Sequence, residues 1–373
     1  MKSDMKIVYV NDAVAIWGGL ERLLVEKMNL MVERLGYEVH LVTVNQGTHP
    51  FPYSLHPNIV HTDLGVGLHR KYQYHGLKRL VKTIQLEYNY ITRMRQLIRE
   101  LCPDIVVLMR FEHWEIYFSV GRTPLVMECH SMCRCNLYGG TFLQHSWVNL
   151  SKRLARQAAV VVTLTEGDAK DWSHYTNRVC VIPNIVHLNT SGVYSDLSSK
   201  SVIFAGRISP QKDVFTLLRI WNFVHDRHPD WVLDIYGEGE DEEQVRREME
   251  AMNGNIILHA PTGSIMERFR ESSMLVLTSE FEPFGLVMPE AMSCGLPVVS
   301  FDCPFGPEAI ITDGVDGFLV RNRSITGFAD RICQLIENKN LRIQMGKAAA
   351  LSAKRYSANE IMPQWKSLFE RLK

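Results

Sequence analysis

The chain has 373 residues, about twice what one hydrophobic core usually supports, so two domains are expected. Hydrophobic residues make up 46% and charged residues 22%, which excludes a disordered chain. The formal net charge is zero, so the overall basic character of many nucleic-acid-binding proteins is missing. Residues 1–190 hold 21 basic and 16 acidic residues, whereas residues 191–373 hold 20 and 25, which indicates two modules with different duties.

Short apolar runs alternate with amphipathic stretches along the first half. Strands are predicted at 6–10, 38–44, 59–64, 105–109, 125–128, 160–164 and 179–182. Apolar residues spaced by three and four predict a helix over 20–35, and Gly36 stands where a terminating glycine belongs. A long helix is predicted over 77–101, because Pro103 cannot continue one.

The second half repeats the alternation. Strands are predicted at 202–205, 232–236, 256–258, 275–278, 298–301 and 318–320, with helices at 211–227, 241–252, 264–272, 286–293, 325–337 and within 340–373. Apolar strands joined by helices predict parallel sheets covered on both faces, so the fold class is α/β with two doubly wound domains. The domain junction is expected within 186–200. Ligands should bind in loops that follow strands, in a cleft between the domains.

The cysteines and the amino-terminal residues indicate the compartment. Eight scattered cysteines in a chain of this length predict a reducing environment rather than a disulfide scaffold. The tightest group is Cys129, His130, Cys133 and Cys135, but a second cysteine pair at zinc-ligand spacing is missing, so no metal is expected. The short apolar run before Asn11 is not a signal peptide, and no run approaches a membrane span. We therefore expect a soluble, cytoplasmic protein.

Two glutamates form the richest candidate for chemistry. Glu282 follows a buried strand, and Glu290 lies in the helix expected to begin at Gly285. The backbone N–H groups of 284–286 are open at that helix start. Such a set can hold a polyhydroxylated ligand, or it can be an exposed loop acid with a helix acid favoured by the dipole.

Other polar residues also follow strands. Arg207 and Lys212 suit phosphate oxygens, unless they are simply solvated cations. Gly18 and Gly19 would let the backbone approach an anion at a helix start, although a plain tight turn uses the same residues. His130 is either a site residue or a satisfied structural histidine.

The segment Glu282-Pro-Phe-Gly-Leu-Val-Met-Pro-Glu290-Ala-Met-Ser-Cys-Gly-Leu-Pro-Val-Val resembles the signature of the family 4 retaining glycosyltransferases. The resemblance extends to 204–212, to 302–320 and to the Gly-Gly-x-Glu loop at 17–21, and so spans nearly the whole chain. It implies the GT-B fold: two Rossmann-like domains facing across a cleft, with the C-terminal helices packing back on the first domain. The implied domains are 1–188 for the acceptor, 189–355 for the nucleotide-sugar, and a returning helix at 356–373.

The resemblance also implies roles for individual residues. Glu282 and the amides of Phe284, Gly285 and Leu286 would hold the sugar, Glu290 the ribose, Arg207 and Lys212 the diphosphate, with His130 beside the sugar and Gly18 and Gly19 in a phosphate or acceptor loop. The chain departs from the family pattern at Ser131, where aspartate is usual, at Ile185, and at 259–261, where a glycine is usual.

The implied activity is a retaining, metal-independent hexosyl transfer from a nucleotide-sugar, expected to be a UDP-sugar, to a glycan or lipid-linked glycan in cell-surface polysaccharide biosynthesis. No cofactor is expected, since the chain holds no Asp-x-Asp and two cations can neutralise the leaving diphosphate. Two alternatives stay open: a nucleotide-sugar epimerase on the same fold, and a non-catalytic nucleotide-sugar-binding subunit. Nucleic acid is not an expected partner.

A basic stretch at 69–99 predicts contact with an anionic membrane surface. It holds eight basic residues against Glu87 alone, with four interleaved tyrosines. The enzyme would then lie peripherally at the inner face of the cytoplasmic membrane. The alternative is a solvated helix whose aromatic residues face inward.

Overall fold

The computed structural model describes residues 5–16, 18–110, 113–134, 142–252 and 254–373. The chain divides into two compact units. Unit 1 comprises Met1–Ile185 together with Ile361–Lys373, and unit 2 comprises Val186–Glu360. The last helix therefore belongs to the same unit as the beginning of the chain.

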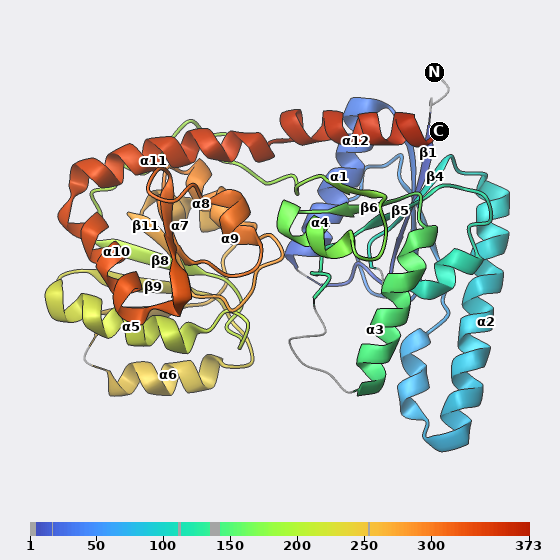
Figure 1. Ribbon diagram of the computed structural model, residues 1–373, viewed down its shortest axis with the longest axis horizontal. Coiled ribbons are helices and arrows are strands. Elements are labelled where there is room, and N and C mark those ends of the chain that lie inside the picture. Colours follow the sequence, from blue (N-terminus) through green and yellow to red (C-terminus); the bar gives the residue numbers. More distant parts are fainter. Residues whose placement is uncertain (1–4, 17, 111–112, 135–141, 253) are drawn as a thin grey trace. The chain divides into compact units, whose positions relative to one another are not determined.

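Unit 1 is built on a parallel sheet with the strand order β3-β2-β1-β4-β5-β6-β7 (Figure 1). Its strands are β1 (Lys6–Asn11), β2 (Glu38–Thr43), β3 (Val60–Asp63), β4 (Ile105–Leu108), β5 (Leu125–Glu128), β6 (Val160–Thr163) and β7 (Val179–Val181). The order reverses between β1 and β4, which is the switch point at which doubly wound sheets bind ligands.

Helices cover both faces of this sheet. The α-helices of unit 1 are α1 (Gly19–Leu35), α2 (Gly76–Leu101), α3 (Phe142–Leu154), α4 (Glu166–Trp172) and α12 (Ala358–Leu372), and the 3-10 helices are η1 (Leu68–Gln73), η2 (Trp114–Phe118) and η4 (Ala155–Gln157). Gly36 ends α1 in the left-handed conformation, and its N–H donates to the carbonyls of Met31 and Val32.

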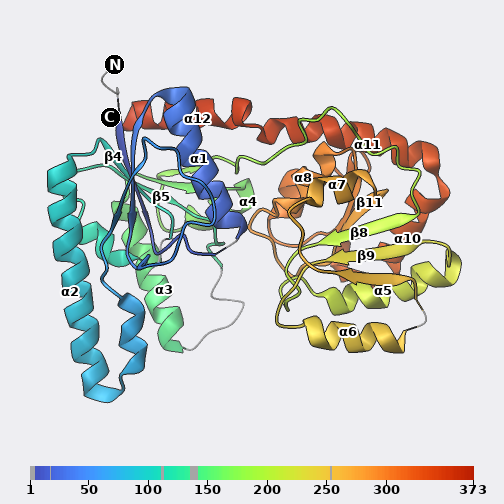
Figure 2. The ribbon, with the colours of Figure 1, turned by 180° about the vertical axis from the view of Figure 1, so that it is seen from behind.

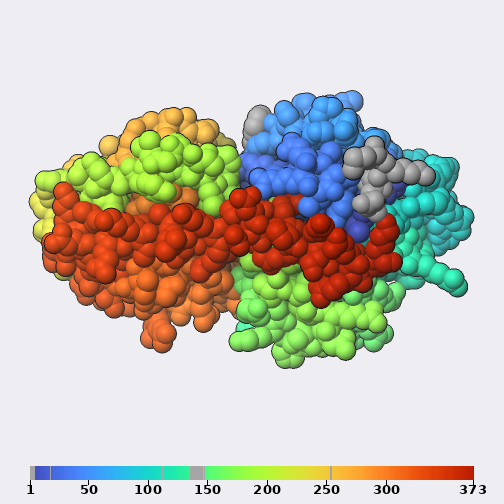
Figure 3. Space-filling view, turned by 90° about the horizontal axis from the view of Figure 1, so that it is seen from above, coloured from blue at the N-terminus to red at the C-terminus, as the bar shows by residue number. Residues whose placement is uncertain are grey.

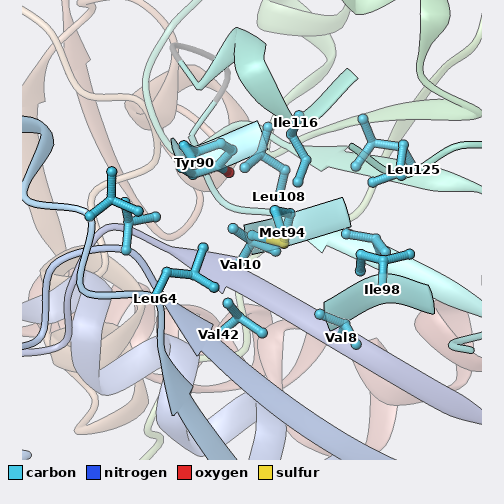
Figure 4. Packing of buried hydrophobic residues seen from close by; sticks show 14 of the residues in the cluster. Val8, Val10, Val42, Leu64, Tyr90, Met94, Ile98, Leu108, Ile116 and Leu125 are labelled. Carbon is cyan, nitrogen blue, oxygen red and sulfur yellow. The ribbon is translucent and has the colours of Figure 1, made fainter. Parts of the chain in front are cut away.

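One core of unit 1 lies between the sheet and α2. Val8, Val10, Val42 and Leu108 on the strands pack against the face of α2 that carries Tyr90, Met94 and Ile98 (Figure 4). These three residues are the buried ones of α2, and all lie in its C-terminal half. The N-terminal half of the helix therefore has no equivalent core beneath it among the described residues.

The opposite face of the sheet is covered by α1 and α12. The ring of Phe369 in α12 lies 6.4 Å from that of Tyr37, and Tyr9 on β1 donates a hydrogen bond to the sulfur of Met31 in α1. The space-filling view shows α12, in the darkest red, lying on the surface of this unit (Figure 3). The expectation that the C-terminal helix packs on the first domain is confirmed.

Unit 2 repeats the same topology. Its parallel sheet has the order β10-β9-β8-β11-β12-β13, with the reversal between β8 and β11. The strands are β8 (Ser201–Ala205), β9 (Val232–Tyr236), β10 (Ile256–His259), β11 (Met274–Leu277), β12 (Val298–Phe301) and β13 (Gly317–Val320).

The helices of unit 2 form two layers (Figures 1 and 2). One layer contains α5 (Val214–Arg227), α6 (Glu242–Ala251) and α10 (Ile325–Glu337); the other contains α7 (Ile265–Arg270), α8 (Val287–Ser293) and α11 (Lys339–Ala353). Three short elements complete the unit: α9 (Gly306–Ile310) between β12 and β13, η5 (Arg321–Arg323) before α10, and η6 (Lys354–Tyr356) after α11.

The predicted α/β fold with two doubly wound sheets is confirmed. Each strand begins and ends within one residue of its predicted bounds. The helix predicted from residue 211 begins only at Val214, because Asp213 takes a left-handed conformation and caps the helix by accepting from the Thr216 N–H. Residues 211–213 instead belong to a loop. None of the described helices is long and apolar enough to cross a membrane.

Candidate functional site

The loops after β8 and β11 lie side by side at the switch point of unit 2. Thr278, just after β11, donates its hydroxyl to the carbonyls of Lys212 (3.0 Å) and Asp213 (2.9 Å). The Glu280 N–H donates to the Gln211 carbonyl at 2.8 Å, and the Gln211 amide donates to Phe281 at 3.0 Å. These four bonds bring two segments about 70 residues apart into one surface.

Glu282 lies at the centre of that surface and is buried. Its Oε1 accepts from the Lys212 ammonium and, at 2.8 Å, from the Ser279 hydroxyl. Its backbone is held by the loop after β12, since its N–H donates to the Pro304 carbonyl at 2.7 Å and its carbonyl accepts from Phe305 at 2.8 Å. A buried carboxylate with a fixed backbone and a cationic partner is preorganised rather than free to rotate.

Gly285 is required by the same loop. It has a φ of +87°, and a Cβ at this position would lie 2.5 Å from the Met288 side chain and 3.6 Å from Glu282 Oε2. Within the described chain, no group accepts from the N–H groups of Phe284, Gly285 or Leu286. Helix α8 begins at Val287, one residue after the start of the predicted range 286–293, so these amides lie in the turn before it. They are open donors beside the Glu282 carboxylate.

The side chain of Phe284 belongs to the hydrophobic core of unit 2. Its ring is buried and packs edge-on against Tyr356, with 5.3 Å between the ring centroids. Glu290 is also buried; it lies in the first turn of α8, where a carboxylate is stabilised by the helix dipole.

Arg207 follows β8 and is exposed. In the described part of the chain it forms no ion pair, so its guanidinium is available to a ligand. Lys212 instead is committed to Glu282, although it is only partly buried. The two predicted phosphate-binding cations therefore differ: one is open, and the other is held by the carboxylate of the neighbouring loop.

Arg323 was not predicted as a site residue. Its guanidinium pairs with Asp213 and donates to the carbonyls of Ser279 (2.9 Å) and Thr278 (3.1 Å). It also lies 4.6 Å from the centroid of the Phe301 ring. From its position after β13, Arg323 thus holds together the loop after β8 and the loop after β11. The sequence held no signal for this role, since Arg323 and Asp213 are 110 residues apart.

In unit 1, His130 follows β5 and is nearly buried. Its Nε2 lies 3.0 Å from Oε1 of Glu128, and Oε2 of Glu128 pairs with the ammonium of Lys27 on α1. The Lys27 ammonium lies 5.2 Å from the Tyr9 ring centroid and 4.6 Å from that of Trp365 in α12. Neither Lys27 nor Glu128 was predicted as a site residue.

Lys27, Glu128 and His130 lie close enough for each charge to affect the others. Burial raises the pKa of Glu128, but Lys27 and His130 outweigh it, so the net shift is downward and the carboxylate stays ionised. Burial lowers the pKa of Lys27 despite the nearby carboxylate. An ionised Glu128 therefore places a negative charge 3.0 Å from Nε2 of His130, in a contact without the geometry of a hydrogen bond.

Gly18 precedes α1, whose first residue is Gly19. A Cβ on Gly18 would lie 2.2 Å from Oε2 of Glu21, so the side chain of Glu21 occupies the space beside the helix start. The carbonyl of Gly18 accepts from Tyr53 at 3.3 Å. Two residues that the sequence singled out near these sites, Trp17 and Cys135, lie outside the described residues. Among those described, no group of three or more side chains is suited to a metal ion.

Two family models match the chain, and together they span most of it. The model for Glycosyltransferase Family 4 matches residues 17–190, and the model for Glycosyl transferases group 1 matches residues 194–352. The chain belongs to the family 4 glycosyltransferases. This glycosyltransferase carries Gly18, Gly19 and His130 in the first matched region and Arg207, Lys212, Glu282 and Glu290 in the second.

Curated relatives align with this chain over very different fractions of their own length. An uncharacterized glycosyltransferase of Haemophilus influenzae is 24% identical over 94% of this chain and 96% of that protein. The poly(ribitol-phosphate) alpha-N-acetylglucosaminyltransferase of Staphylococcus aureus is 30% identical, but over 56% of this chain and 43% of that enzyme. The amylovoran biosynthesis glycosyltransferase AmsD of Erwinia amylovora is 30% identical over 57% of this chain and 62% of that protein. The chain thus spans less than two thirds of the latter two.

Solved structures confirm the GT-B fold. The S. aureus protein TarM has a TM-score of 0.79 at 16% identity and covers 99% of both chains. Anabaena HepE, solved in complex with UDP, has a TM-score of 0.75 at 18% identity over 98% of this chain and 100% of the other. The pneumococcal O-GlcNAc transferase GtfA, solved with UDP and GlcNAc, has a TM-score of 0.75 at 14% identity over 99% of both.

Proposed function

We propose that this glycosyltransferase moves a hexose from a UDP-sugar to a glycan or lipid-linked glycan acceptor in cell-surface polysaccharide biosynthesis. The observation that carries the proposal is the arrangement around Glu282: a buried carboxylate bonded to Lys212 and Ser279, next to three open backbone amides. Carboxylates accept from sugar hydroxyls and amides donate to sugar oxygens. Together they suit a bound pyranose.

Each residue then has a role in the proposal. Glu282 and the amides of 284–286 bind the transferred sugar, and Glu290 binds the ribose. Arg207 and Lys212 stabilise the negative charge that grows on the leaving diphosphate, a contribution of roughly 3–4 kcal/mol for a preorganised donor. His130, beside the Glu128 carboxylate, lies by the sugar. Gly18 and Gly19, at the start of α1, contact phosphate or acceptor.

The relatives support the donor and the acceptor class. UDP is named with three of the structurally similar proteins, from Staphylococcus, Anabaena and the pneumococcus. The Staphylococcus relative acts on poly(ribitol-phosphate), a Bacillus subtilis relative is a poly(glycerol-phosphate) alpha-glucosyltransferase, and the Erwinia relative serves amylovoran biosynthesis. Two of these names give a polymer as the acceptor.

We propose that the anomeric configuration is retained and that no metal takes part. UDP-glucose and UDP-N-acetylglucosamine are α-linked donors, so the alpha products named for two relatives correspond to retention. In a same-face transfer, the leaving phosphate oxygen takes the proton of the acceptor hydroxyl as the new C1–O bond forms and the old one breaks. The protein supplies positioning and positive charge, which Mg²⁺ supplies in other transferases. The enzyme would act at the inner face of the cytoplasmic membrane.

Incubation of the purified chain with a panel of UDP-sugars, with and without excess EDTA, tests this proposal. We expect slow release of UDP from one donor, faster release with a polysaccharide or lipid-linked acceptor, and no effect of the chelator. The anomeric proton coupling in the NMR spectrum of the product should be that of an α linkage. Conversion of the donor to its epimer without release of UDP would indicate an epimerase instead. Donor binding with no turnover under any condition would indicate a binding subunit.

A further inference from the structure

The N-terminal half of α2 exposes a row of large apolar side chains. Leu77, Leu80, Val81, Ile84 and Tyr88, here called the α2 stripe, are between 56% and 76% exposed. Further along the same helix, Tyr90, Met94 and Ile98 are buried against the sheet. Large apolar residues gathered on an exposed helix face mark an interaction site more often than scattered ones do.

The α2 stripe is one continuous face. At about 100° per residue, its five side chains fall within a sector of roughly 100° around the helix axis. Both ribbon views show the beginning of α2, together with η1, projecting past the edge of the unit 1 sheet (Figures 1 and 2). This half of the helix contacts η1 on one side, through Arg79 and the Tyr72 ring, while the five side chains of the α2 stripe stay exposed.

Basic side chains border the α2 stripe. At about 100° per residue, Lys78 lies about 60° around the helix from the nearest stripe residue and Lys82 about 100° from it. The guanidinium of Arg79 lies 5.1 Å from the centroid of the Tyr72 ring. Tyr72 in η1 is itself 64% exposed. Between 69 and 99 the basic residues exceed the acidic ones by eight to one, and the acidic residue, Glu87, is partly buried.

We propose that the α2 stripe inserts into the interfacial layer of an anionic lipid membrane, with the bordering cations on the lipid phosphates. A helix with leucines on one face and lysines or arginines beside it lies in the plane of such an interface. Tyrosine is favoured at the level of the headgroups, and long basic side chains reach from the apolar layer to the phosphates. Electrostatic attraction alone would not require the exposed leucines, and apolar burial alone would not require the cations.

Charge decides between a membrane and a second copy of the chain as the occupant. A symmetric dimer through the α2 stripe would place the same cluster of cations against itself, because each copy presents the same patch at a two-fold interface. An anionic bilayer instead offers opposite charge. Polybasic segments gain attraction at such a surface, and this attraction weakens with salt within a Debye length of about 8 Å at physiological ionic strength.

A groove continues from the α2 stripe toward the C-terminal end of the helix. It has a volume of about 710 Å³, and Tyr88, Ile91 and Phe118 line it together with Arg95 and Arg99. Arg95 donates to the Phe118 carbonyl at 2.7 Å, which keeps its guanidinium at the groove wall. Glu100 also lines the groove and accepts from the Gln96 amide at 2.8 Å, so two arginines stand against one carboxylate. An apolar floor with this excess of positive charge suits an acyl chain below a phosphate group. The groove therefore extends the same surface.

Vesicle binding tests the inference without any sugar substrate, so its failure and failure of the proposed transferase activity are separate results. The full chain is sedimented with vesicles of phosphatidylethanolamine containing phosphatidylglycerol, and with pure phosphatidylcholine. We expect binding to the anionic vesicles alone, weakening severalfold at high salt. Hydrogen exchange should show new protection of the 76–88 amides on the vesicles. The triple variant Leu80→Gln, Val81→Gln, Ile84→Gln should bind about tenfold more weakly and lose that protection.

The matched control is Phe223→Gln with Leu351→Gln, which also replaces exposed apolar residues on helices, α5 and α11. It should bind as the parent chain does. Glutamine keeps helix propensity, and the circular dichroism spectrum of each variant checks the fold. Three results would overturn the proposal: no binding of the parent chain at low salt, equal binding by the triple variant, or self-association in solution that the triple variant abolishes while vesicles bind neither form.

Discussion

Lys27 on α1 and Glu128 on β5 form an ion pair in which each side chain is only 2% exposed, and Glu128 in turn contacts His130. The pair joins the first helix of the chain to the strand that ends just before the candidate site histidine. The Trp365 ring of α12 closes over the Lys27 ammonium. The ion pair that joins α1 to β5 therefore also sets the charge beside His130.

Removing one charge of this pair should destabilise the protein strongly. Lys27→Met and Glu128→Gln should each lower the free energy of unfolding by about 3–5 kcal/mol, since either leaves an unpaired buried charge. The double variant should recover part of the loss. Urea unfolding of the three variants measures this. Lys200→Met, at the exposed pair with Asp230, is the control and should cost no more than about 1 kcal/mol. Additive losses in the double variant would contradict the coupling.

Glu128 should also make stability depend on acid pH. Its pKa is lowered in the folded state, so the unfolded chain binds more protons as pH falls. The stabilisation is therefore fully present above the usual pKa of a glutamate and is lost as pH falls from that value toward the lower folded one. Unfolding curves measured between neutral and acid pH should show a steeper loss for the parent chain than for Glu128→Gln. Parallel curves would refute the assignment.

Arg207 and Lys212 should both be needed for turnover. Replacing either by alanine should lower kcat roughly a hundredfold or more, because each removes preorganised positive charge at the leaving diphosphate. Lys212→Ala should also lower the melting temperature, because it leaves the buried Glu282 carboxylate without its cationic partner. Arg207→Ala should leave the melting temperature unchanged, because Arg207 is exposed. Arg219→Ala, at an exposed site on α5, is the control. A near-normal rate in either variant would remove that residue from the phosphate site.

Glu282 and Glu290 should bind different parts of the donor, the sugar and the ribose. Glu290→Gln should weaken binding of free UDP, whereas Glu282→Gln should weaken binding of the UDP-sugar and leave UDP nearly unaffected. Calorimetry of each variant with both ligands separates the two effects, with Glu308→Gln, at an exposed position of α9, as the matched control. If both variants lose both ligands equally, the two glutamates do not have separate partners.

Arg323 should act by holding the site loops in position. Arg323→Lys keeps the positive charge but loses the planar guanidinium that reaches Asp213 and two carbonyls. Its activity should therefore be little better than that of Arg323→Gln. Both Arg323→Lys and Arg323→Gln should lower kcat by tenfold to about a hundredfold, the cost of a small displacement of reacting groups. Arg321→Gln, exposed in the same η5 turn, is the control. Full activity in Arg323→Lys would show that charge alone matters.

The architecture was predictable because buried parallel strands are continuous apolar runs. All the strands and the long helices α1, α2 and α10 follow from patterns read over a few consecutive residues. The short helix α4 was missed: it contains Gly167 and two aspartates, and depends on a cap in which Thr165 accepts from the Asp168 N–H. Such a helix has no apolar period of its own.

The sequence by itself determined the fold class, the two-unit organisation and the short motif around Glu282, because each of these depends on patterns among neighbouring residues. Tertiary structure alone decided which charges meet. Lys212 and Glu282 are 70 residues apart, Lys27 and Glu128 are 101 apart, and Arg323 and Asp213 are 110 apart. It also decided that Leu80 and Ile84 face solvent, since an apolar helical period predicts a buried face equally well. Strand order and helix packing set these pairings and exposures, and neither is encoded in a local pattern.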